Sequence, residues 1–134
     1  LKILLRKRGK FLFLRNAADT HWDLLGGRID NVEYKISLKR VLAREIREEL
    51  GRVRYGVGSV AMLYRRFYHW RNIYIFVVVY EAEYRGGAVR LSREHSRAVW
   101  LTRKEVMQLR EKEFWSKEEY DMTKRYFKEL SASR

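Results

Sequence analysis

A capped amphipathic segment, Ser37 to Gly51 (SLKRVLAREIREELG), constrains the fold of this chain more than any other feature. Its apolar residues recur at the spacing of an α-helix and form a single stripe, which consists of Leu38, Leu42, Ile46 and Leu50. Ser37 is a candidate N-cap and Gly51 a candidate C-cap, so both ends of the predicted helix are marked. We interpret the apolar stripe as ordinary core.

Runs of alternating or continuous apolar residues on both sides of this helix predict β-strands. Before the helix we predict a hairpin from Lys2 to Arg15 with its tight turn at Gly9-Lys10, and a short apolar run from Trp22 to Leu25 that stops at Gly26-Gly27. A loop from Arg28 to about Ile36 leads into the helix. After the helix we predict strands from Val53 to Arg66 and from Asn72 to Tyr84, followed by a turn at Arg85-Gly86-Gly87. The second long strand is apolar enough to predict burial on both faces.

The C-terminal part of the chain predicts one more strand and two helices. The strand lies around Ala98 to Leu101. The first helix begins with a capping box of Thr102 and Glu105 and runs to about Glu111. The second begins in the same way with Ser116 and Glu119 and runs to about Leu130, before a frayed tail, SASR. No linker rich in Gly, Ser or Pro interrupts this order. We therefore expect one α/β (α+β) domain over residues 1–134, with a mixed β-sheet between helices.

Composition narrows the class of protein. The 134 residues are 46% hydrophobic, which is enough to fold, and the longest apolar run, Ile73 to Tyr80, is far shorter than the roughly 20 residues of a membrane-spanning helix. The absence of cysteine excludes disulfides and thiolate metal sites but does not identify the compartment. No secretory signal is visible, and our default expectation is an intracellular (cytoplasmic) protein without a membrane span. The net charge of +13 indicates an anionic partner and is compatible with RNA, although a solubilising surface explains it equally well.

Three carboxylates of the predicted helix point to metal chemistry. Glu45, Glu48 and Glu49 are spaced i, i+3 and i+4, so their side chains converge on one patch and repel one another. A hard cation would remove this conflict, and ligands that are all oxygen favour Mg²⁺ or Mn²⁺ over zinc. The alternative is a solvated charged face in which Arg44 pairs with Glu48 at i+4.

The segment from Gly26 to Gly51 resembles the signature of the Nudix hydrolase family, G-x5-E-x7-R-E-U-x-E-E-x-G-U, in which U is a bulky apolar residue. The matching residues, in order, are Gly27, Glu33, Arg44, Glu45, Ile46, Glu48, Glu49 and Gly51. Two positions depart from the signature. Ten residues, 34 to 43, separate Glu33 from Arg44 where the family has seven, and Arg52 replaces the final apolar residue.

The resemblance implies an α/β/α sandwich and a Mg²⁺-dependent (or Mn²⁺-dependent) hydrolase that cleaves the pyrophosphate bond of a nucleoside diphosphate derivative. It implies that Glu45, Glu48 and Glu49 are metal ligands, with the Gly26 carbonyl as an additional one. It also implies that Glu33 and Arg44 form an ion pair between loop and helix. In the family a further acid outside the signature often binds metal or serves as the base, and Glu94 is the candidate here. The general base is then either Glu45 or Glu94.

A segment that interleaves cations and aromatics, Arg65 to Tyr74 (RRFYHWRNIY), has the composition of a surface that holds phosphates and stacks bases. A strand edge and turn with ordinary aromatic packing explains it as well. The candidate substrate-binding residues are Arg6, Arg28, Arg65, His69 and Trp70. Trp22 lines a pocket or belongs to the core, whereas His21 and His95 are expected to be structural or surface residues.

Three functions remain open at this level. The first is hydrolysis of a small nucleotide, such as a nucleoside triphosphate, a nucleotide sugar or a dinucleotide. The second is removal of pyrophosphate from RNA 5′ ends, which the positive charge motivates. The third is a catalytically silent module that binds nucleotides or RNA. These patterns carry no information on oligomeric state.

Overall fold

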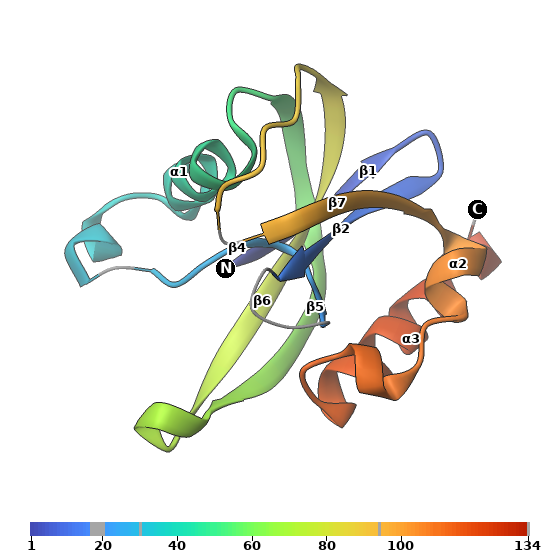
Figure 1. The fold of residues 1–134 in the computed structure, drawn as a ribbon. Coiled ribbons are helices and arrows are strands. Elements are labelled where there is room, and N and C mark those ends of the chain that lie inside the picture. The colour runs from blue at the N-terminus through green and yellow to red at the C-terminus, as the bar shows by residue number, and fades with distance from the viewer. Residues whose placement is uncertain (17–20, 30, 94, 134) are drawn as a thin grey trace.

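The computed structural model describes residues 1–16, 21–29, 31–93 and 95–133, and among these residues seven strands form one sheet with helices on both faces (Figure 1). The elements are β1 (Lys2–Lys7), β2 (Lys10–Asn16), β3 (Trp22–Asp23), β4 (Leu25–Gly26), the 3-10 turn η1 (Asn31–Lys35), α1 (Leu38–Leu50), β5 (Arg54–Tyr68), η2 (His69–Arg71), β6 (Ile73–Gly86), β7 (His95–Thr102), α2 (Arg103–Met107), η3 (Glu111–Glu113) and α3 (Lys117–Ser133). No helix in the described part of the chain is long and apolar enough to cross a membrane.

The sheet is mixed. Its strand order is β3-β2-β1-β6-β5, with β4 paired to β1 and β7 paired to β2. β1 and β6 run parallel, whereas the remaining pairs are antiparallel. α1 covers one face with Leu42, Ile46 and Leu50, while Val106 of α2 and Phe127 of α3 pack on the other. The predicted mixed sheet between helices is therefore confirmed.

The caps of α1 and α2 lie where the sequence places them. The Ser37 hydroxyl accepts a hydrogen bond from the Arg40 N–H, and Gly51 ends the helix with φ 84°. Thr102 and Glu105 form a complete capping box. The predicted apolar stripe is wrong at Leu38, which is 45% exposed, because the first turn of α1 contributes nothing to the core that the later turns build.

The first hairpin turns at Arg8-Gly9 instead of the predicted Gly9-Lys10. Cross-strand pairing joins Lys7 to Lys10, which leaves two residues in the turn, with φ 48° at Arg8 and 75° at Gly9. Positive φ at both central positions defines a primed turn, whose twist matches that of the flanking strands. Gly9 thus occupies the second turn position.

The long β5–β6 hairpin departs from the prediction in burial. Its pairing extends from Arg54 opposite Gly86 to Tyr68 opposite Ile73, so both strands are longer than expected. Tyr74 and Phe76 are 64% and 71% exposed, and the predicted burial of this strand on both faces is wrong for its first half. Figure 1 shows the reason, since the tip of the hairpin projects beyond the helices that cover the sheet.

Several other predicted boundaries shift because tertiary contacts extend or shorten the local pattern. η1 occupies part of the predicted loop, β7 begins at His95, α2 ends at Met107, and α3 continues to Ser133 through part of the predicted tail. Only half of the second capping box forms. The Ser116 hydroxyl accepts from the Glu119 N–H at 3.2 Å, but the Glu119 carboxylate contacts Arg66 on β5.

Candidate active site

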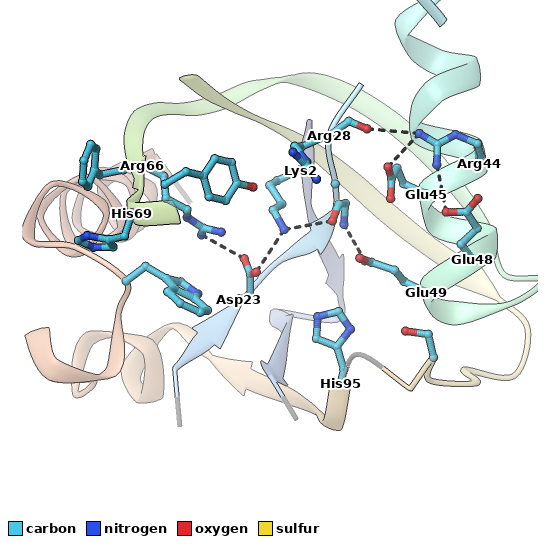
Figure 2. A pocket seen from close by; sticks show the side chains of 16 residues that line it. Lys2, Asp23, Arg28, Arg44, Glu45, Glu48, Glu49, Arg66, His69 and His95 are labelled. Atoms are coloured by element: carbon cyan, nitrogen blue, oxygen red, sulfur yellow. Dashed lines mark hydrogen bonds and ion pairs between the residues drawn. The ribbon is translucent and has the colours of Figure 1, made fainter. Parts of the chain in front are cut away.

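A cleft of about 680 Å³ lies between the C-terminal half of α1, the β3–β4 segment and the tip of the β5–β6 hairpin (Figure 2). Its two ends differ in chemistry. Carboxylates of α1 and the paired glycines line one end, the acid end, whereas aromatic side chains line the other. Buried charged residues form the floor between them.

The acid end brings the three predicted carboxylates to one wall of the cleft. Glu45 and Glu49 are buried, at 6% and 5% exposure, while the Glu48 side chain is 58% exposed. The Gly26 N–H donates to Glu49 Oε2 at 2.7 Å, which ties α1 to the end of β4. Because the helix places these residues one turn apart, all three line the same cleft.

Glycine is required at positions 26 and 27 because other atoms of the protein lie too close to leave room for a side chain. A Cβ on Gly27 would lie 2.7 Å from Glu45 Oε2, and a Cβ on Gly26, where φ is 124°, would lie 2.1 Å from the Leu1 carbonyl oxygen. Side chains at these positions would displace the carboxylate or β1. The backbone of β4 therefore reaches the acid end only because Gly26 and Gly27 lack side chains.

Arg44 neutralises this end of the cleft. Its Nε and Nη2 donate to the two carboxylate oxygens of Glu33 at 2.6 and 2.7 Å, a bidentate pair between η1 and α1. The same guanidinium contacts Glu45 Oε1 and Glu48 Oε2, each at 3.0 Å. Glu33 thus reaches Arg44 despite the longer spacing, because residues 34–43 pass through the end of η1, the turn at Ser37 and the first turns of α1. The i, i+4 pair of the charged-face alternative is also present.

Burial changes the acidity of the two inner carboxylates. Burial raises the pKa of Glu49 to about 7, against the opposing effects of the Gly26 N–H and the Lys2 ammonium. The pKa of Glu45 is also raised, mainly by burial, although Arg44 opposes the shift. With a pKa of about 7, the Glu49 carboxyl is partly protonated at neutral pH.

The acid end offers the donor types of a hard divalent cation. Among the described residues, no three acidic or histidine side chains lie close enough to hold one ion as placed. Glu45 and Glu49 are nevertheless buried carboxylates with raised pKa, which a divalent ion would stabilise in the charged form. Together with Glu48 and the Gly26 carbonyl they supply only oxygen, so these residues fit Mg²⁺ or Mn²⁺.

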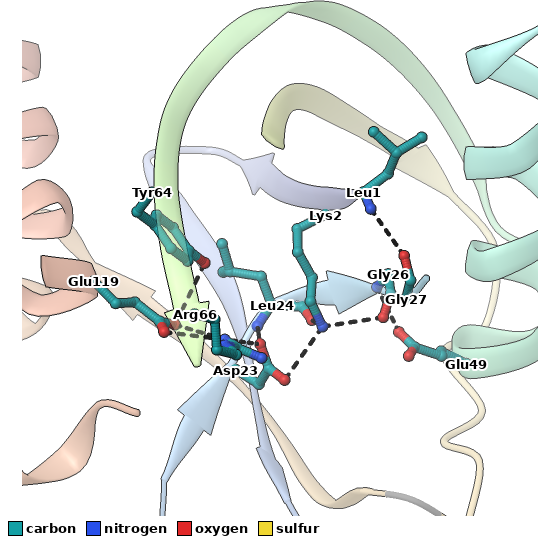
Figure 3. A network of polar contacts seen from close by, with 10 residues as sticks. All are labelled: Leu1, Lys2, Asp23, Leu24, Gly26, Gly27, Glu49, Tyr64, Arg66 and Glu119. Atoms are coloured by element: carbon teal, nitrogen blue, oxygen red, sulfur yellow. Dashed lines mark hydrogen bonds and ion pairs between the residues drawn. The ribbon is translucent and has the colours of Figure 1, made fainter. Parts of the chain in front are cut away.

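A buried ionic network forms the floor of the cleft (Figure 3). The Asp23 carboxylate contacts Lys2 Nζ at 3.2 Å and Arg66 Nη2 at 3.3 Å, and Arg66 also donates to Glu119 at 2.9 Å. Burial alone would raise the pKa of Asp23, but Lys2 and Arg66 together lower it. For Glu119, burial outweighs Arg66 and raises the pKa.

Lys2 joins this network to the acid end. Its ammonium also donates to the carbonyl oxygens of Leu24 and Gly26, at 3.3 and 3.1 Å, so that it holds the β4 backbone beside α1. We did not expect Lys2, Asp23 or Arg66 in the site. A signal existed in the sequence, since Lys2 and Asp23 are charged residues next to apolar runs, ILL and LL, that pack in the core.

The aromatic end is built by the tip of the β5–β6 hairpin and by the turn before α3. Phe67, Tyr68, His69 and Trp115 line it. Trp115 is 38% exposed, and its ring lies 5.4 Å from the Arg66 guanidinium, while the Arg28 guanidinium lies 5.6 Å from the Tyr68 ring. Exposed rings beside cations suit the stacking of a base or another flat group.

Of the predicted substrate-binding residues, Arg28 and His69 line the cleft. Arg65 does not. It contacts Glu118 of α3 at 3.2 Å, and the neighbouring Arg66 enters the cleft instead, because successive strand residues point to opposite faces. Arg6 lies at the C-terminal end of β1, away from the cleft, in which only Lys2 of that strand takes part.

The remaining candidates divide between described and undescribed positions. Glu94 and the side chain of Trp70 lie outside the described residues. Trp22 belongs to the core. His95 is buried and lines the cleft, whereas the ring of His21 lies 4.7 Å from that of Trp115.

Comparison with known proteins identifies the family. The family model described as the NUDIX domain matches residues 2–124. The chain belongs to the Nudix hydrolase family. The predicted membership and the enzyme class, a Nudix-type nucleotide pyrophosphohydrolase, are therefore confirmed. No curated protein matches the chain.

Solved Nudix structures share the fold across nearly the whole chain. The MutT protein from Methanosarcina mazei is 25% identical with a TM-score of 0.76, and the match covers 96% of this chain and 91% of that one. An ADP-ribose pyrophosphatase from Streptococcus suis is 17% identical, with a TM-score of 0.67 and coverage of 99% and 89%. An Ap4A hydrolase from C. elegans is 18% identical, with a TM-score of 0.62 and coverage of 98% and 93%. Nudix hydrolases use divalent metal ions, which agrees with the donors of the acid end.

Proposed function

We propose that this Nudix hydrolase uses Mg²⁺ or Mn²⁺ to cleave the pyrophosphate bond of a small nucleotide in which a nucleoside diphosphate is linked to another group. One observation carries the proposal. A single cleft joins buried, incompletely neutralised carboxylates to exposed aromatic rings, with Arg28 and Arg66 among the residues between them. The carboxylates suit the metal-assisted cleavage of a pyrophosphate, and the aromatic rings suit the binding of a nucleoside.

The acid end would hold the metal through Glu45, Glu48, Glu49 and the carbonyl of Gly26. When bound, the ion supplies neutralisation of pyrophosphate charge and activation of a water molecule. Arg44 and Glu33 would then act as positioning residues. The guanidinium now contacts Glu45 and Glu48, so substrate-bound metal would take over part of its role as counterion.

The base would be Glu49, Glu45 or Glu94. Efficient proton transfer at neutral pH needs a group whose pKa lies near 7. Glu49 meets this condition without metal, and the raised pKa of Glu45 moves in the same direction. Glu94, the candidate from the family pattern, remains a third choice for this role.

The aromatic end would bind the nucleoside. Trp115 and His69 offer ring faces and edges, and Arg28 lies on the path toward the acid end, where it can contact phosphate. The similar structures include an Ap4A hydrolase and an ADP-ribose pyrophosphatase, whose names specify small nucleotides. Such substrates are favoured over RNA 5′ ends and over a silent binding module.

The test is a panel of nucleoside triphosphates, nucleotide sugars and dinucleotides incubated with Mg²⁺, with products identified by mass spectrometry. The expected result is release of a nucleoside monophosphate or inorganic pyrophosphate from at least one small substrate. Reaction in ¹⁸O-labelled water then locates the attacked phosphorus. The absence of metal-dependent turnover across the whole panel would contradict the proposal.

A further inference from the structure

The cleft does not account for the positive charge of the chain. Three of the four Lys and Arg residues that line it, Lys2, Arg44 and Arg66, each contact a carboxylate, so their charges are locally neutralised. The chain nevertheless carries a net charge of +13. A second group of cations lies elsewhere, at the end of the sheet that is remote from the cleft.

The sheet topology gathers this second group. β1 and β6 are parallel neighbours, with Arg6 opposite Glu83, so the C-terminal ends of both strands reach the same end of the sheet. β5 begins there as well, because Arg54 pairs with Gly86. Figure 1 shows the β1–β2 turn and the end of β6 on the side of the molecule away from the hairpin tip at η2. At about 3.3 Å per residue, the length of β1 separates this end from Lys2 in the cleft by roughly 16 Å.

Five cations from three strands and a turn form what we call the basic end, namely Arg6, Lys7, Arg8, Arg54 and Arg85. Four of the five are exposed, and Arg6 is half-buried. Within residues 1–16, 21–29, 31–93 and 95–133, none of the five takes part in an ion pair. The Lys7 ammonium lies 5.0 Å from the centre of the Tyr84 ring.

Glycines allow two of the arginines to lie flat on the sheet. A Cβ at Gly86 would lie 2.3 Å from Arg54 Nη2, and a Cβ at Gly56 would lie 2.6 Å from Arg85 Nη2. Each guanidinium therefore rests on the strand opposite its own.

Two hollows give the basic end its shape. Arg6 and Arg85 line both of them, a hollow of about 650 Å³ beside the β1–β2 turn and one of about 250 Å³ beside Tyr126. The acids here are Glu83, which lines both hollows, and Glu81, which accepts a hydrogen bond from Tyr126. Five cations against these two carboxylates leave the surface positive.

We propose that the basic end binds the phosphate backbone of nucleic acid without regard to base sequence, as an interaction surface separate from the catalytic cleft. Four of the five cations of the basic end are arginines, and the planar guanidinium group can donate two parallel hydrogen bonds to phosphate oxygens. The described part of this surface lacks the apolar side chains with which an interfacial segment inserts into a bilayer. Among the described residues, no large exposed hydrophobic side chain lies in residues 6–10 or 83–87, so nothing there would insert among lipids.

The test compares two variants that lose the same charge. The first is R8N/R54Q/R85Q, in which asparagine suits the positive φ of position 8. The matched control is K39Q/K104Q/K112Q, which removes three exposed cations that line neither the hollows nor the cleft. If the triple variant unfolds, R8N alone is tested in its place, because this single change lies in an exposed turn.

Binding is measured by fluorescence anisotropy with a labelled oligouridylate of about 20 nucleotides, from about 50 to about 400 mM salt. We expect the first variant to bind about tenfold more weakly and its log–log salt slope to fall by about 2, at about 0.7 per lost phosphate contact. R8N alone should lower the slope by about 0.7. The control should change affinity by less than about threefold, because nonspecific binding depends on local phosphate contacts. Hydrolysis of a small nucleotide should be unchanged in both variants.

Three outcomes would overturn the proposal. These are equal weakening in both triple variants, no binding by the unaltered protein at the lowest salt, and preferential binding to phosphatidylserine vesicles over the oligonucleotide. Failure of the hydrolysis panel, by contrast, would affect only the proposed catalytic function, because the binding assay does not depend on turnover.

Discussion

The two ends of the sheet handle charge in opposite ways. At the floor of the cleft, cations and carboxylates are buried together. Asp23, Arg66 and Glu119 are all less than 10% exposed, and both carboxylates pair with Arg66. At the basic end, Arg8, Arg54 and Arg85 are exposed and have no ion pair among the described residues. Buried charges are costly to leave alone, whereas solvated charges cost little and remain available to a ligand. The stability of the cleft therefore depends on each of its charged residues, whereas ligand binding at the basic end depends on the total positive charge of that surface.

The largest expected effect comes from removing single charges at the acid end. Glu48→Gln and Glu49→Gln nearly preserve shape, and we expect each to lower hydrolysis by orders of magnitude while the fold is retained, because the repulsion among the helix carboxylates falls. Mg²⁺ should raise the melting temperature of the unaltered protein and raise that of the variants less. Assays and melting curves with and without EDTA measure both effects.

Glu111→Gln is the matched control for this prediction, since Glu111 is an exposed carboxylate of η3 outside the cleft. It should leave both activity and the Mg²⁺ response unchanged. Full activity of either cleft variant, or of the unaltered protein in chelator, would falsify the metal-centred mechanism and leave α1 as an ordinary charged helix.

Neighbouring arginines of β5 test the cost of a buried charge. Arg66→Met removes the cation that Glu119 and Asp23 share, and we expect a loss of about 3–5 kcal/mol in the free energy of unfolding. Arg65→Met removes an exposed partner of Glu118, and the loss should stay below about 1 kcal/mol. Urea titrations give both values, and equal losses would show that burial does not distinguish the two positions.

The raised pKa of Glu49 predicts a pH dependence of stability in the metal-free protein. Its pKa is about 7 in the fold against an ordinary value of 4.5, so the folded state binds more protons between these values and stability falls as pH rises through that window. The expected loss is roughly 2–3 kcal/mol. The groups acting on Glu49 are Lys2, Glu45, Asp23 and the Gly26 N–H.

The measurement is chemical denaturation in EDTA from pH 5 to 8. Glu45 and Glu119, whose pKa values are also raised, add slopes of the same sign, so the informative quantity is the difference between the unaltered protein and Glu49→Gln. That difference should shrink toward zero at pH 5, where Glu49 is mostly protonated. Identical pH profiles for the two proteins would contradict the prediction.

The smallest expected effect concerns the pair between η1 and α1. Glu33→Ala and Arg44→Ala should each lower stability by about 1–2 kcal/mol and reduce activity, because the bidentate pair holds the loop beside the acid end. Arg44→Lys retains the charge without the fork geometry and should recover only part of the loss. Thermal melts that match the unaltered protein for both alanine variants, with full activity, would show that the pair does not brace the site.

The elements that local chemistry dictates could be predicted closely. α1 begins after Ser37 and ends before Gly51 because a hydroxyl cap and a glycine cap satisfy its terminal backbone groups. The turn of the first hairpin was predicted to within one residue. The alternation of apolar and polar residues indicates the two strands, but the twist of the sheet selects which residues form the turn. The exposure of Phe76 could not be read from an apolar run, because it depends on where the covering helices end.

The sequence by itself determined the family, the helix that carries Glu45, Glu48 and Glu49, and the glycines that face it, because these residues lie within one short segment and their spacing is set by helix geometry. Only the tertiary structure decided that Lys2, Asp23, Arg66 and Glu119 join in one ionic network, of which the first three line the cleft, and that Arg6, Arg54 and Arg85 gather at the opposite end. Both groups join residues distant in the chain. Which strands become neighbours, and in what register, is fixed by burial across the whole sheet, and no local pattern encodes it.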